Sequence, residues 1–404
     1  MYWDLVGLIL GIVPLLLFGY AYFGYPAILR LWSAMRPTIP AALGADGEQP
    51  EWPEITITIP AYNEADSIGA TIERVLALDY PPDRRHILVV SDASTDRTDE
   101  VVRSYSGKGV ELLRLPERGG KTAAENAAAR RLRGELVVNA DATIVIERRA
   151  LKDLVAAFSD PSVGVASGRD VSIGGSGDDQ NAGESQYVGY EMWIRQLETA
   201  VGSIVGASGC FYATRAELQD RDFPGSLSRD FASALIAREH GYRSVSVTTA
   251  VCRVPRTTAL GSEYRRKIRT MARGLRTLWF KRALLNPVRY GRFAFMLASH
   301  KLARWMVPLT APLVLVGLAL LAPRHPVAAI LLGLGLGSVV FGIVTLKSGG
   351  PLLGRLGTMI AYGVTSLVAG LIAWLRAFSG RSNEVWEPTR RPRAAAQTRG
   401  LGGK

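Results

Sequence analysis

The sequence predicts an α/β protein with a mostly parallel sheet and flanking helices, joined to interfacial amphipathic helices and transmembrane α-helices. Three observations predict this class. The middle of the 404-residue chain alternates short apolar strands with segments of helical period. Long runs without a charged residue occur near the N-terminus and toward the C-terminus. Residues 263–404 contain 22 Lys and Arg against 3 Asp and Glu, as expected beside membrane helices.

The composition excludes several other classes. Apolar residues make up 48% of the chain and charged residues 21%, which excludes a disordered or fibrous protein. Two cysteines cannot build a disulfide scaffold or a four-cysteine zinc site, and four histidines leave little room for a histidine-rich metal centre. The basic region, residues 263–404, could also bind nucleic acid, but the sequence has no zinc-finger motif and no aromatic platform for single strands. Membrane lipids are therefore predicted partners, and nucleic acid is not.

Residues 1–36 are predicted to form an N-terminal transmembrane anchor. Leu5–Leu29 has no charged residue over 25 positions, and a bilayer core needs about 20. A cleaved signal peptide would need a basic start and a small-residue cleavage site, whereas this chain starts Met-Tyr-Trp-Asp. A retained anchor is therefore favoured, followed by a polar linker over residues 37–52.

Residues 305–378 are predicted to form the remaining transmembrane helices. Three charge-free runs of 18 to 20 residues follow one another here, which is typical of membrane spans. The runs are Trp305–Ala322, Val327–Leu346 and Leu356–Leu375.

The charged flanks predict the orientation of the chain. Arg30 and Arg36 follow the first span, so its N-terminus is expected outside and residues 30–304 in the cytosol. Four crossings would then leave the basic tail, residues 379–404, outside, against the same rule. Either one late segment is re-entrant or lies along the surface, or the tail breaks the charge rule. A cytosolic tail is favoured.

Residues 263–304 are predicted to form amphipathic helices in the membrane interface. Apolar residues recur there at steps of three and four, and arginines fill the positions between them. A second such stretch, Arg289–Arg304, leads into the next span. A solvated surface helix is the alternative, but both stretches adjoin membrane segments. The apolar residues of the first stretch are Tyr264, Ile268, Met271, Leu275 and Leu278.

Residues 53–262 are predicted to form a soluble α/β domain. Four strand-like runs alternate with three helical segments, which favours parallel strands with helices on both faces. The expected strands are Ile55–Ile59, Ile87–Ser91, Glu111–Leu115 and Leu136–Asn139, and the expected helices are Ala65–Leu78, Thr95–Tyr105 and Lys121–Leu132.

Polar clusters follow three of these strands, at the sheet edge where ligands bind in such folds. The clusters are Pro60–Glu64, Ser91–Asp96 and Asn139–Asp141. Acidic residues at successive strand ends can hold a ribose, a base edge and a metal-bound diphosphate. Neither a GxGxxG nor a GxxxxGKS/T motif is present, which argues against hydride transfer with a dinucleotide and against ATP hydrolysis.

At these clusters the chain resembles membrane-integrated family 2 glycosyltransferases, the branch that includes cellulose, chitin and hyaluronan synthases. The resemblance follows the chain in order from the anchor to the C-terminal spans. It implies a GT-A type fold for residues 53–262 and a nucleotide-sugar donor, with a UDP-sugar as first choice. It also implies an integral protein of a bacterial-type plasma membrane, with the catalytic domain in the cytosol.

The resemblance gives donor-binding roles to four residues. Tyr62 would stack on the base, Glu64 would bind the base or ribose, and Asp92 would accept a hydrogen bond from the nucleotide. Lys121, after the double glycine Gly119-Gly120, would lie near the diphosphate as a compact cation. Without the resemblance, these residues would be interpreted as a strand-ending turn, a helix cap and a solvated lysine.

Asp141-Ala-Thr143 matches the family's metal site, with Thr143 in place of the second carboxylate. The resemblance implies Mg²⁺ or Mn²⁺ as cofactor. Mg²⁺ is often held by one or two carboxylates plus substrate phosphates, so Asp141 with the donor's diphosphate would suffice. The alternative for Asp141 is a strand-end cap.

The resemblance also assigns the acceptor side and the base. Gly206–Arg215 resembles the acceptor-side loop, in which Gly209 and Cys210 would approach the sugar. Asp230 occupies the place of the family's general base, while Arg229 replaces the preceding acid. A base is needed because a sugar hydroxyl is a poor nucleophile until its proton is taken. The alternative for Asp230 is an acid favoured by a helix N-terminus.

Two further motifs lie toward the C-terminus. In Arg266-Lys-Ile-Arg-Thr270, Arg269 would pair with the diphosphate and Arg266 would lie on the acceptor side. Thr270 replaces the tryptophan of processive members. Trp386 and Arg390 resemble a tail motif of hyaluronan synthases and would gate the active site, unless the tail only binds anionic lipid.

Together these assignments predict an inverting glycosyltransferase that extends a cell-surface polysaccharide. A single-transfer enzyme acting on a lipid acceptor is the main alternative, because Thr270 weakens the case for processivity. A non-catalytic partner of such an enzyme is the third possibility, motivated by Thr143 and Arg229.

Overall fold

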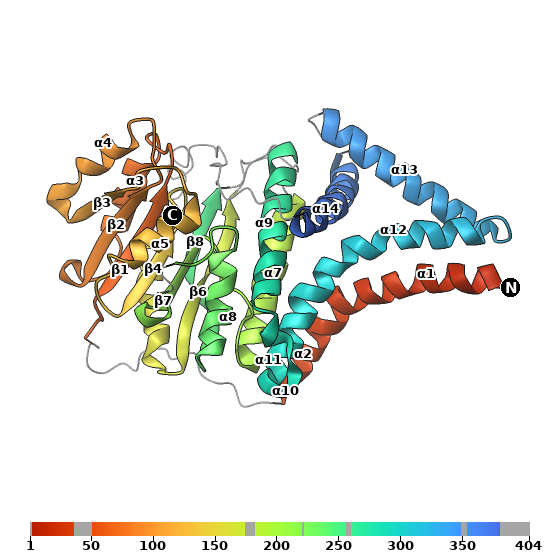
Figure 1. Cartoon of the computed structure of the whole chain (residues 1–404), viewed down its shortest axis with the longest axis horizontal. Coiled ribbons are helices and arrows are strands. Elements are labelled where there is room, and N and C mark those ends of the chain that lie inside the picture. Colours follow the sequence, from red (N-terminus) through yellow and green to blue (C-terminus); the bar gives the residue numbers. More distant parts are fainter. Residues whose placement is uncertain are drawn as a thin grey trace, which may run out of the picture. The chain divides into compact units, whose positions relative to one another are not determined.

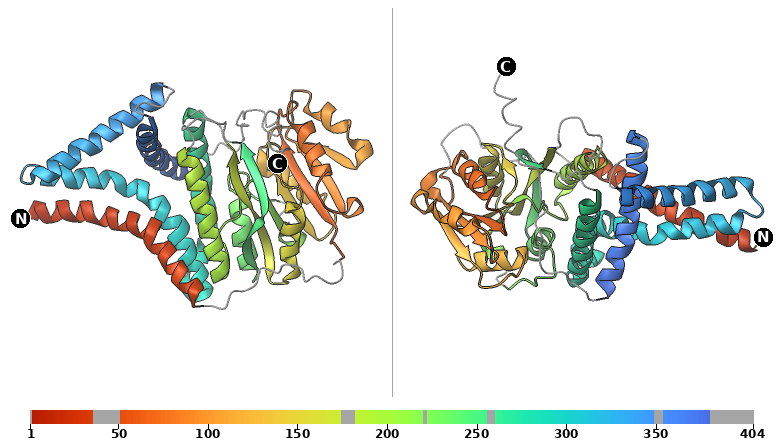
Figure 2. Two further views of the ribbon diagram at one scale, coloured as in Figure 1. Left: turned by 180° about the vertical axis from the view of Figure 1, so that it is seen from behind. Right: turned by 90° about the horizontal axis from the view of Figure 1, so that it is seen from above.

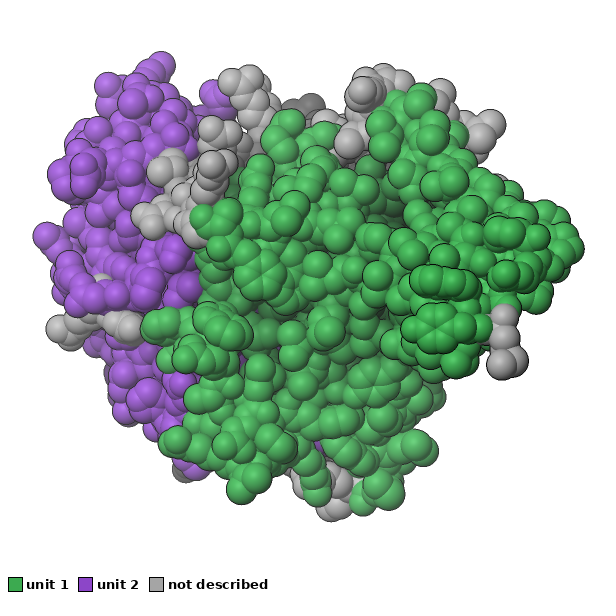
Figure 3. All heavy atoms as spheres, turned by 45° about the vertical axis from the view of Figure 1, so that its right-hand side comes forward, with its two compact units in different colours: residues 1–36, 176–186, 258–382 green, residues 37–175, 187–257, 383–404 purple. Residues whose placement is uncertain are grey.

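The computed structural model describes residues 2–35, 51–173, 182–219, 222–255, 260–348 and 354–379. The chain forms two compact units, shown in different colours in Figure 3. The helical unit contains residues 1–36, 176–186 and 258–382, and the sheet unit contains residues 37–175, 187–257 and 383–404. The sheet unit holds the predicted metal and base residues and the predicted donor residues other than Arg269, and the helical unit holds Arg269 and the candidate membrane helices.

The sheet unit is built on a mixed sheet whose eight described strands follow the order β3-β2-β1-β4-β7-β6-β8-β5 (Figure 1). The first four strands in the chain pair in parallel, whereas β7 is antiparallel to both of its neighbours, and β8 runs parallel to β6. The predicted mostly parallel α/β class is confirmed. The strands are β1 (Ile55–Ala61), β2 (Arg85–Ser91), β3 (Val110–Arg114), β4 (Leu136–Ala140), β5 (Val145–Ile146), β6 (Val163–Ile173), β7 (Phe211–Arg215) and β8 (Arg243–Pro255).

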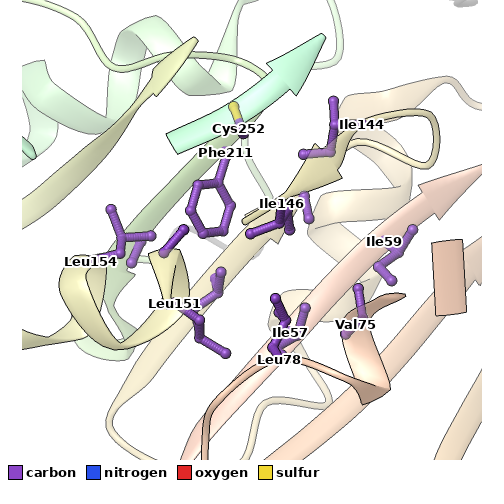
Figure 4. Close-up of a cluster of buried hydrophobic side chains, with 14 of the residues drawn as sticks. Ile57, Ile59, Val75, Leu78, Ile144, Ile146, Leu151, Leu154, Phe211 and Cys252 are labelled. Atoms are coloured by element: carbon purple, nitrogen blue, oxygen red, sulfur yellow. The ribbon is translucent and has the colours of Figure 1, made fainter. Parts of the chain in front are cut away.

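Helices cover both faces of this sheet. On one face, α3, α4 and α6 pack into a large buried cluster that includes Ile57 and Ile59 of β1 and Phe211 of β7 (Figure 4). On the other face, α5 packs against Leu88 and Val90 of β2, because successive strand residues point to opposite sides. The helices are α3 (Ile68–Leu76), α4 (Thr98–Arg103), α5 (Lys121–Ala129), α6 (Ala150–Ala156), α7 (Ala182–Val201) and α8 (Arg229–Glu239).

The alternation of Ile and Thr in β1 explains its central place. The isoleucines point into the large cluster, and the threonines point to the other face, where their hydroxyls are satisfied. Thr56 Oγ1 donates to the carbonyl oxygen of Arg133 at 2.7 Å, and Thr58 Oγ1 donates to Asn139 Oδ1 at 2.9 Å. β1 is therefore buried on both faces without an apolar residue at every position.

The predicted elements before residue 141 agree with the structure to within a few residues. α3 begins at Ile68 instead of Ala65, because a turn intervenes in which the amides of Ser67 and Ile68 both bond to Glu64 O. Beyond residue 141 the agreement is weaker. Phe211–Arg215, interpreted as part of the acceptor-side loop, is the buried strand β7.

Among its described residues, the helical unit contains four helices that are long and apolar enough to cross a membrane. They agree in number and position with the four predicted spans. They are Tyr2–Ala34, Arg292–Leu321, Pro326–Thr345 and Met359–Phe378. The elements of this unit are α1 (Tyr2–Gly19), α2 (Tyr25–Ala34), α9 (Leu260–Phe280), α10 (Pro287–Tyr290), α11 (Arg292–Leu297), α12 (Arg304–Leu321), α13 (Pro326–Ser348) and α14 (Gly354–Phe378).

The second predicted interfacial stretch, Arg289–Arg304, is not a separate helix. α11 continues through a π-helical turn, Ala298–Ala303, directly into α12. The candidate span therefore begins at Arg292, inside the predicted interfacial stretch. The position of Arg289–Arg304 in the membrane interface stays a prediction.

α1 and α12 form a closely packed antiparallel pair (Figures 1 and 2). A Cβ atom on Gly317 would lie 2.6 Å from the carbonyl oxygen of Gly7, so the two backbones meet where neither residue has a side chain. At one end of the pair, Asp4 and Arg324 form an ion pair at 3.1 Å. The N-terminal helix is thus an integral part of the helical unit.

α9 uses its apolar side for helix packing. Ile268, Leu275 and Leu278 are buried, and α14 packs along this helix. Lys267 Nζ donates to Ser366 Oγ of α14 at 2.7 Å. The predicted amphipathic helix therefore exists, and a second helix covers it.

Candidate active site

The segment Arg118–Lys121, at the start of α5, connects the predicted site residues. It contacts Tyr62 after β1, Asp92 after β2 and Asp141 after β4. These three strands are parallel, so the residues that follow them meet at one edge of the sheet. The structure therefore brings Tyr62, Asp92, Lys121 and Asp141 together.

Asp92 fixes the backbone of this segment. Its buried carboxylate accepts hydrogen bonds from the amides of Gly119 at 2.7 Å and Gly120 at 2.9 Å. Gly120 has a φ of 85°, a left-handed conformation that favours glycine. The double glycine is thus explained by the turn it makes before α5. The direct contact of Asp92 with a nucleotide stays a prediction.

Tyr62 and Glu64 lie in the turn after β1. The guanidinium of Arg118 lies 3.8 Å from the centroid of the Tyr62 ring, a cation–π contact that the sequence analysis did not foresee. The carboxylate of Glu64 accepts a hydrogen bond from Ser67 Oγ at 2.5 Å. Their predicted roles in binding the base and ribose stay predictions.

Lys121 is the cation of the cluster. Its Nζ donates to Asp141 Oδ1 at 2.6 Å and to the carbonyl oxygen of Gly209 at 2.8 Å. Burial lowers the pKa of Lys121, but the negative charges of Asp141, Glu125 and Asp230 outweigh burial and hold this pKa above its ordinary value. Lys121 is therefore charged at neutral pH, and its interpretation as a solvated surface lysine is wrong.

Gly209 brings the predicted base to the same place. A Cβ atom at position 209 would lie 2.5 Å from Asp230 Oδ2, so the carboxylate occupies the space of a side chain. Asp230 lies in the first turn of α8, and its Oδ1 accepts a hydrogen bond from Ser228 Oγ at 2.5 Å. The carbonyl oxygen of Gly209 therefore accepts a hydrogen bond from Lys121. The predicted base, Asp230, packs against the same glycine, where any other residue would have a side chain.

Arg229, which replaces the family's first acid, is buried and held by α5. It donates to Gln219 Oε1 at 2.7 Å and to Asn126 Oδ1, and its Nε lies 3.9 Å from Glu125 Oε2. Burial raises the pKa of Glu125, although Lys121 and Arg229 oppose the shift. Sequence reasoning missed Glu125. Its spacing of four residues from Lys121, which puts both on one helix face, was the available signal.

Asp170 is a second missed carboxylate, beside the acceptor-side loop. It accepts hydrogen bonds from Ser208 Oγ at 2.7 Å and from Cys252 Sγ at 3.2 Å, and Ser208 Oγ in turn accepts from the amide of Cys210 at 3.2 Å. Burial, and then the charge of Asp170, raise the pKa of the Cys252 thiol. No motif marks Asp170, since it lies within the long strand β6.

Asp141 is a metal candidate with one carboxylate. Within the part of the chain that the structure describes, no three His, Cys, Asp or Glu side chains gather into an ion site. The side chain of Asp141 is 22% exposed, so a donor's diphosphate has access to it. Oxygen ligands of this kind fit Mg²⁺ or Mn²⁺ when substrate phosphates complete the coordination.

The remaining predicted residues belong to the helical unit or to the part of the chain that is not described. Arg266, Arg269 and Thr270 belong to α9 in the helical unit, and their roles stay predictions. Trp386 and Arg390 lie outside the described residues.

The fold is similar to that of a known glycosyltransferase structure. A mannosyltransferase from Pyrobaculum calidifontis, solved in complex with GDP-Man and Mn²⁺, superposes with a TM-score of 0.70 at 23% identity. The match covers 94% of this chain and 100% of that chain. At this identity the likeness shows the fold alone, and the fold is of the GT-A type.

Sequence comparison gives the family. Residues 56–218 match the family described as glycosyl transferase family 2. A beta-monoglucosyldiacylglycerol synthase of Synechocystis is 27% identical over 194 residues, covering 46% of this chain and 40% of the relative. A poly-beta-1,6-N-acetyl-D-glucosamine synthase of Staphylococcus aureus is 24% identical over 220 residues, covering 53% of each. The chain spans about half the length of the curated relatives it matches.

Fold and matched segment together define the class as glycosyltransferase, on a GT-A type sheet. More narrowly, the chain carries a glycosyltransferase family 2 domain. This confirms the predicted family 2 domain and the predicted fold class, and membership of the membrane-integrated branch stays a prediction.

Proposed function

We propose that this protein is an inverting membrane glycosyltransferase that transfers a sugar from a nucleotide-sugar, first choice a UDP-sugar, to a growing cell-surface polysaccharide. The observation that carries the proposal is the contact of Lys121 with both Asp141 and Gly209, with Asp230 against the same glycine. An inverting transfer needs a base for the acceptor and positive charge for the leaving group. This cluster supplies both within one set of contacts.

In the proposed reaction, Asp230 takes the proton of an acceptor hydroxyl while the oxygen attacks the anomeric carbon. The new carbon–oxygen bond forms opposite the breaking bond to the diphosphate, which inverts the anomeric centre. Lys121, kept charged by its carboxylate neighbours, stabilises the negative charge that develops on the departing nucleoside diphosphate. Arg269 would add a guanidinium, which can bind phosphate through two hydrogen bonds.

The donor's other groups are bound by the strand-end residues. Tyr62 stacks on the base, Glu64 and Asp92 bind the nucleoside, and Asp92 also keeps Gly119 and Gly120 in place. Mg²⁺ or Mn²⁺, held by Asp141 and the diphosphate, would supply Lewis-acid stabilisation of the leaving group. The Mn²⁺ in the Pyrobaculum structure supports a divalent cation here.

The acceptor is proposed to approach from the side of Gly209, Cys210 and Arg266. A lipid acceptor, with one sugar transferred, is the second candidate. Thr270 stands where processive relatives have tryptophan, and one relative is a glucosyldiacylglycerol synthase. A non-catalytic partner of such an enzyme is the third, because Thr143 and Arg229 replace acids.

The proposed location is a bacterial-type plasma membrane with the sheet unit in the cytosol. Arg30 and Arg36 at the end of the first span support this side. Nucleotide sugars are made in the cytosol, so the donor would be available there.

A panel of nucleotide sugars, with Mg²⁺ or Mn²⁺ and sizing of the product, tests the proposal on the purified full-length protein. A ladder of products supports polysaccharide synthesis, and a single sugar on lipid supports the second candidate. Asp230→Asn is the matched control in every assay. Absence of both transfer and hydrolysis with every donor would refute the catalytic proposal in favour of a non-catalytic partner.

A further inference from the structure

We propose that α14 does not cross the membrane but lies along its cytosolic surface beside α9, so that the chain crosses three times, by α1, α12 and α13. The partner of α14 is then the headgroup layer of the inner leaflet. This inference goes beyond glycosyl transfer, because it concerns how the chain sits in the bilayer.

α14 lies side by side with α9 and runs in the same direction. Three contacts between them keep a nearly constant offset in residue number, which is the mark of two parallel helices in contact over several turns. The contacts pair Lys267 with Ser366, Met271 with Gly370, and Arg276 with the carbonyl oxygen of Arg376. The orientation of α9 therefore sets the orientation of α14.

α9 is too charged to cross a bilayer. It carries five Arg and one Lys within residues 265–276, and it is not among the helices apolar enough to span. Charged residues at the centre of a membrane helix strongly oppose its insertion. If α14 crossed, Ser366 would lie near mid-membrane and would hold the Lys267 ammonium there at 2.7 Å. Along the surface, the ammonium stays at the level of the headgroups.

The contacts of α14 with α12 and α13 show the same arrangement. Leu315 of α12 and Gly335 of α13 lie side by side, at the same height along the two helices, since a Cβ atom on Gly335 would lie 2.8 Å from Leu315 Cδ2. Pro308 lies seven residues from Leu315, and Gly342 lies seven residues from Gly335, in both cases away from the turn between α12 and α13. Pro308 and Gly342 are therefore also at the same height along the pair of helices.

α14 touches both of these level residues. Gly370 lies against Pro308, and Val364 lies 2.7 Å from a Cβ atom placed on Gly342. Val364 and Gly370 are six residues apart, which is about 9 Å along a helix. If α14 ran parallel to α12 and α13, these two residues would lie at different heights and could not contact both Pro308 and Gly342. α14 therefore runs across the ends of α12 and α13, as the right-hand view of Figure 2 shows.

Aromatic and exposed apolar residues fit this surface position. Trp374 Nε1 donates to the carbonyl oxygen of Trp305 at 2.6 Å, and Tyr362 lies under the Lys267 ammonium. Trp and Tyr are enriched at the membrane–water interface. Phe378 is 78% exposed, an apolar side chain available to the acyl boundary.

Three crossings also satisfy the charge rule. They place the basic residues after α1, between α13 and α14, and in the tail on one side of the membrane. On the opposite side, Arg324 is paired with Asp4. The basic residues on the shared side include Arg30, Arg36, Lys347, Arg355, Arg376, Arg390 and Arg391.

Epitope tags at the two ends of the full-length chain test the number of crossings. With three crossings the tags lie on opposite sides, so in intact spheroplasts a protease removes only one of them. With four crossings both tags lie on the same side, which would overturn the proposal whatever the orientation. Permeabilised cells, in which both tags are cleaved, are the control.

Depth measurements test α14 itself. Single cysteines replace Ile360 or Leu367 on α14, and Leu336 or Ile343 on α13, in a Cys210→Ala/Cys252→Ala background. Each is labelled with bimane in phosphatidylethanolamine–phosphatidylglycerol vesicles, and doxyl lipids quench the label according to depth. Both pairs are seven residues apart, so each lies on one helix face.

The two helices should give different results. On α13 the inner site, Leu336→Cys, should be deeper than Ile343→Cys by about 10 Å, from the helical rise. On α14 the two sites should have the same depth, because the helix lies in the plane of the membrane. A Leu367→Cys label about 10 Å deeper than Ile360→Cys would show that α14 spans the bilayer.

Discussion

The two halves of the sheet make different contributions to the site. In the parallel half, β1 to β4 follow one another along the chain, and the ends of β1, β2 and β4 carry polar clusters. In the mixed half, β7 inserts between β4 and β6, and its pairing brings the carbonyl oxygen of Cys210 to 3.0 Å from the amide of Asp141. The site forms where the halves meet. The proposed donor residues of the strand ends come from one half, and Gly209 and the proposed base Asp230 come from the other.

Asp230→Asn should have the largest effect, because it removes the proposed base from the mixed half. Turnover should fall by about 10²–10⁴-fold, the range for general base catalysis. Donor affinity should be unchanged, since the parallel half is intact. Steady-state release of nucleoside diphosphate and donor titration calorimetry measure the two quantities.

Asp222→Asn is the matched control for this prediction, because Asp222 lies before α8 and is 81% exposed. It should keep full activity. An Asp230→Asn enzyme that retains more than a tenth of wild-type turnover would exclude Asp230 as the base.

Gly209→Ala should have the next largest effect, because it disturbs the junction of the halves. The new methyl group would lie 2.5 Å from Asp230 Oδ2, so the carboxylate must move. A misplacement of about 1 Å can cost about 10²-fold in rate, so turnover should fall by up to that factor. Gly189→Ala, on α7 with nothing near the added Cβ atom, should be silent in the same assay. Equal activity of the two variants would contradict this account of Gly209.

Tyr62→Ala should weaken donor binding without slowing turnover at saturating donor. Stacking of a base on an aromatic ring is worth about 1–3 kcal/mol, so the Kd of the donor should rise about tenfold or more. Tyr62→Phe keeps the ring and should bind nearly as the wild type. A fall in kcat with an unchanged Kd of the donor would show that Tyr62 acts in the chemical step and not in donor binding.

Asp160→Asn should have the smallest effect, on the stability of the mixed half. Hydrogen bonds from Ser162, opposed by burial, and the charge of Arg243 at 2.8 Å hold the pKa of Asp160 below its ordinary value of 3.8. A carboxylate with a lowered pKa stabilises the fold above that ordinary value and loses its contribution as pH falls through the folded value. At pH 7 the variant should lose about 1 kcal/mol of stability.

Melting curves in detergent check this prediction. A loss of about 1 kcal/mol corresponds to roughly 2–4 °C in Tm at pH 7, and the difference should shrink below pH 3.8. Asp83→Asn, whose side chain is 81% exposed, should leave Tm unchanged. A difference that grows toward acid pH would contradict the sign of the shift.

The same contrast explains what sequence could and could not predict. Strand ends in the parallel half were predictable, because a buried β-branched run followed by polar residues is a local pattern. Lys121 was singled out by the family resemblance, and the double glycine before it only made a solvated lysine less attractive. The contacts of Arg229 with Glu125, and of Cys252 with Asp170, join residues 82 or more positions apart. No local pattern encodes such pairs, since they depend on which strands become neighbours.

The four apolar helices teach a related lesson. Length and hydropathy identify α14 as a candidate span, but neither says which way the helix lies. Its direction is set by contacts with Lys267 on α9 and Pro308 on α12, which are distant in sequence. Hydropathy therefore predicts which segments avoid water, and packing decides whether they cross.

During synthesis, α1 leaves the ribosome long before α12 exists, although Gly7 and Gly317 end up in contact. As a membrane span, α1 would therefore have its glycine surface uncovered until α12 is synthesised. An anchor helix with a larger residue in place of Gly7 would insert equally well, but its side chain would collide with α12 near Gly317. The glycine surface of α1 is thus matched to α12.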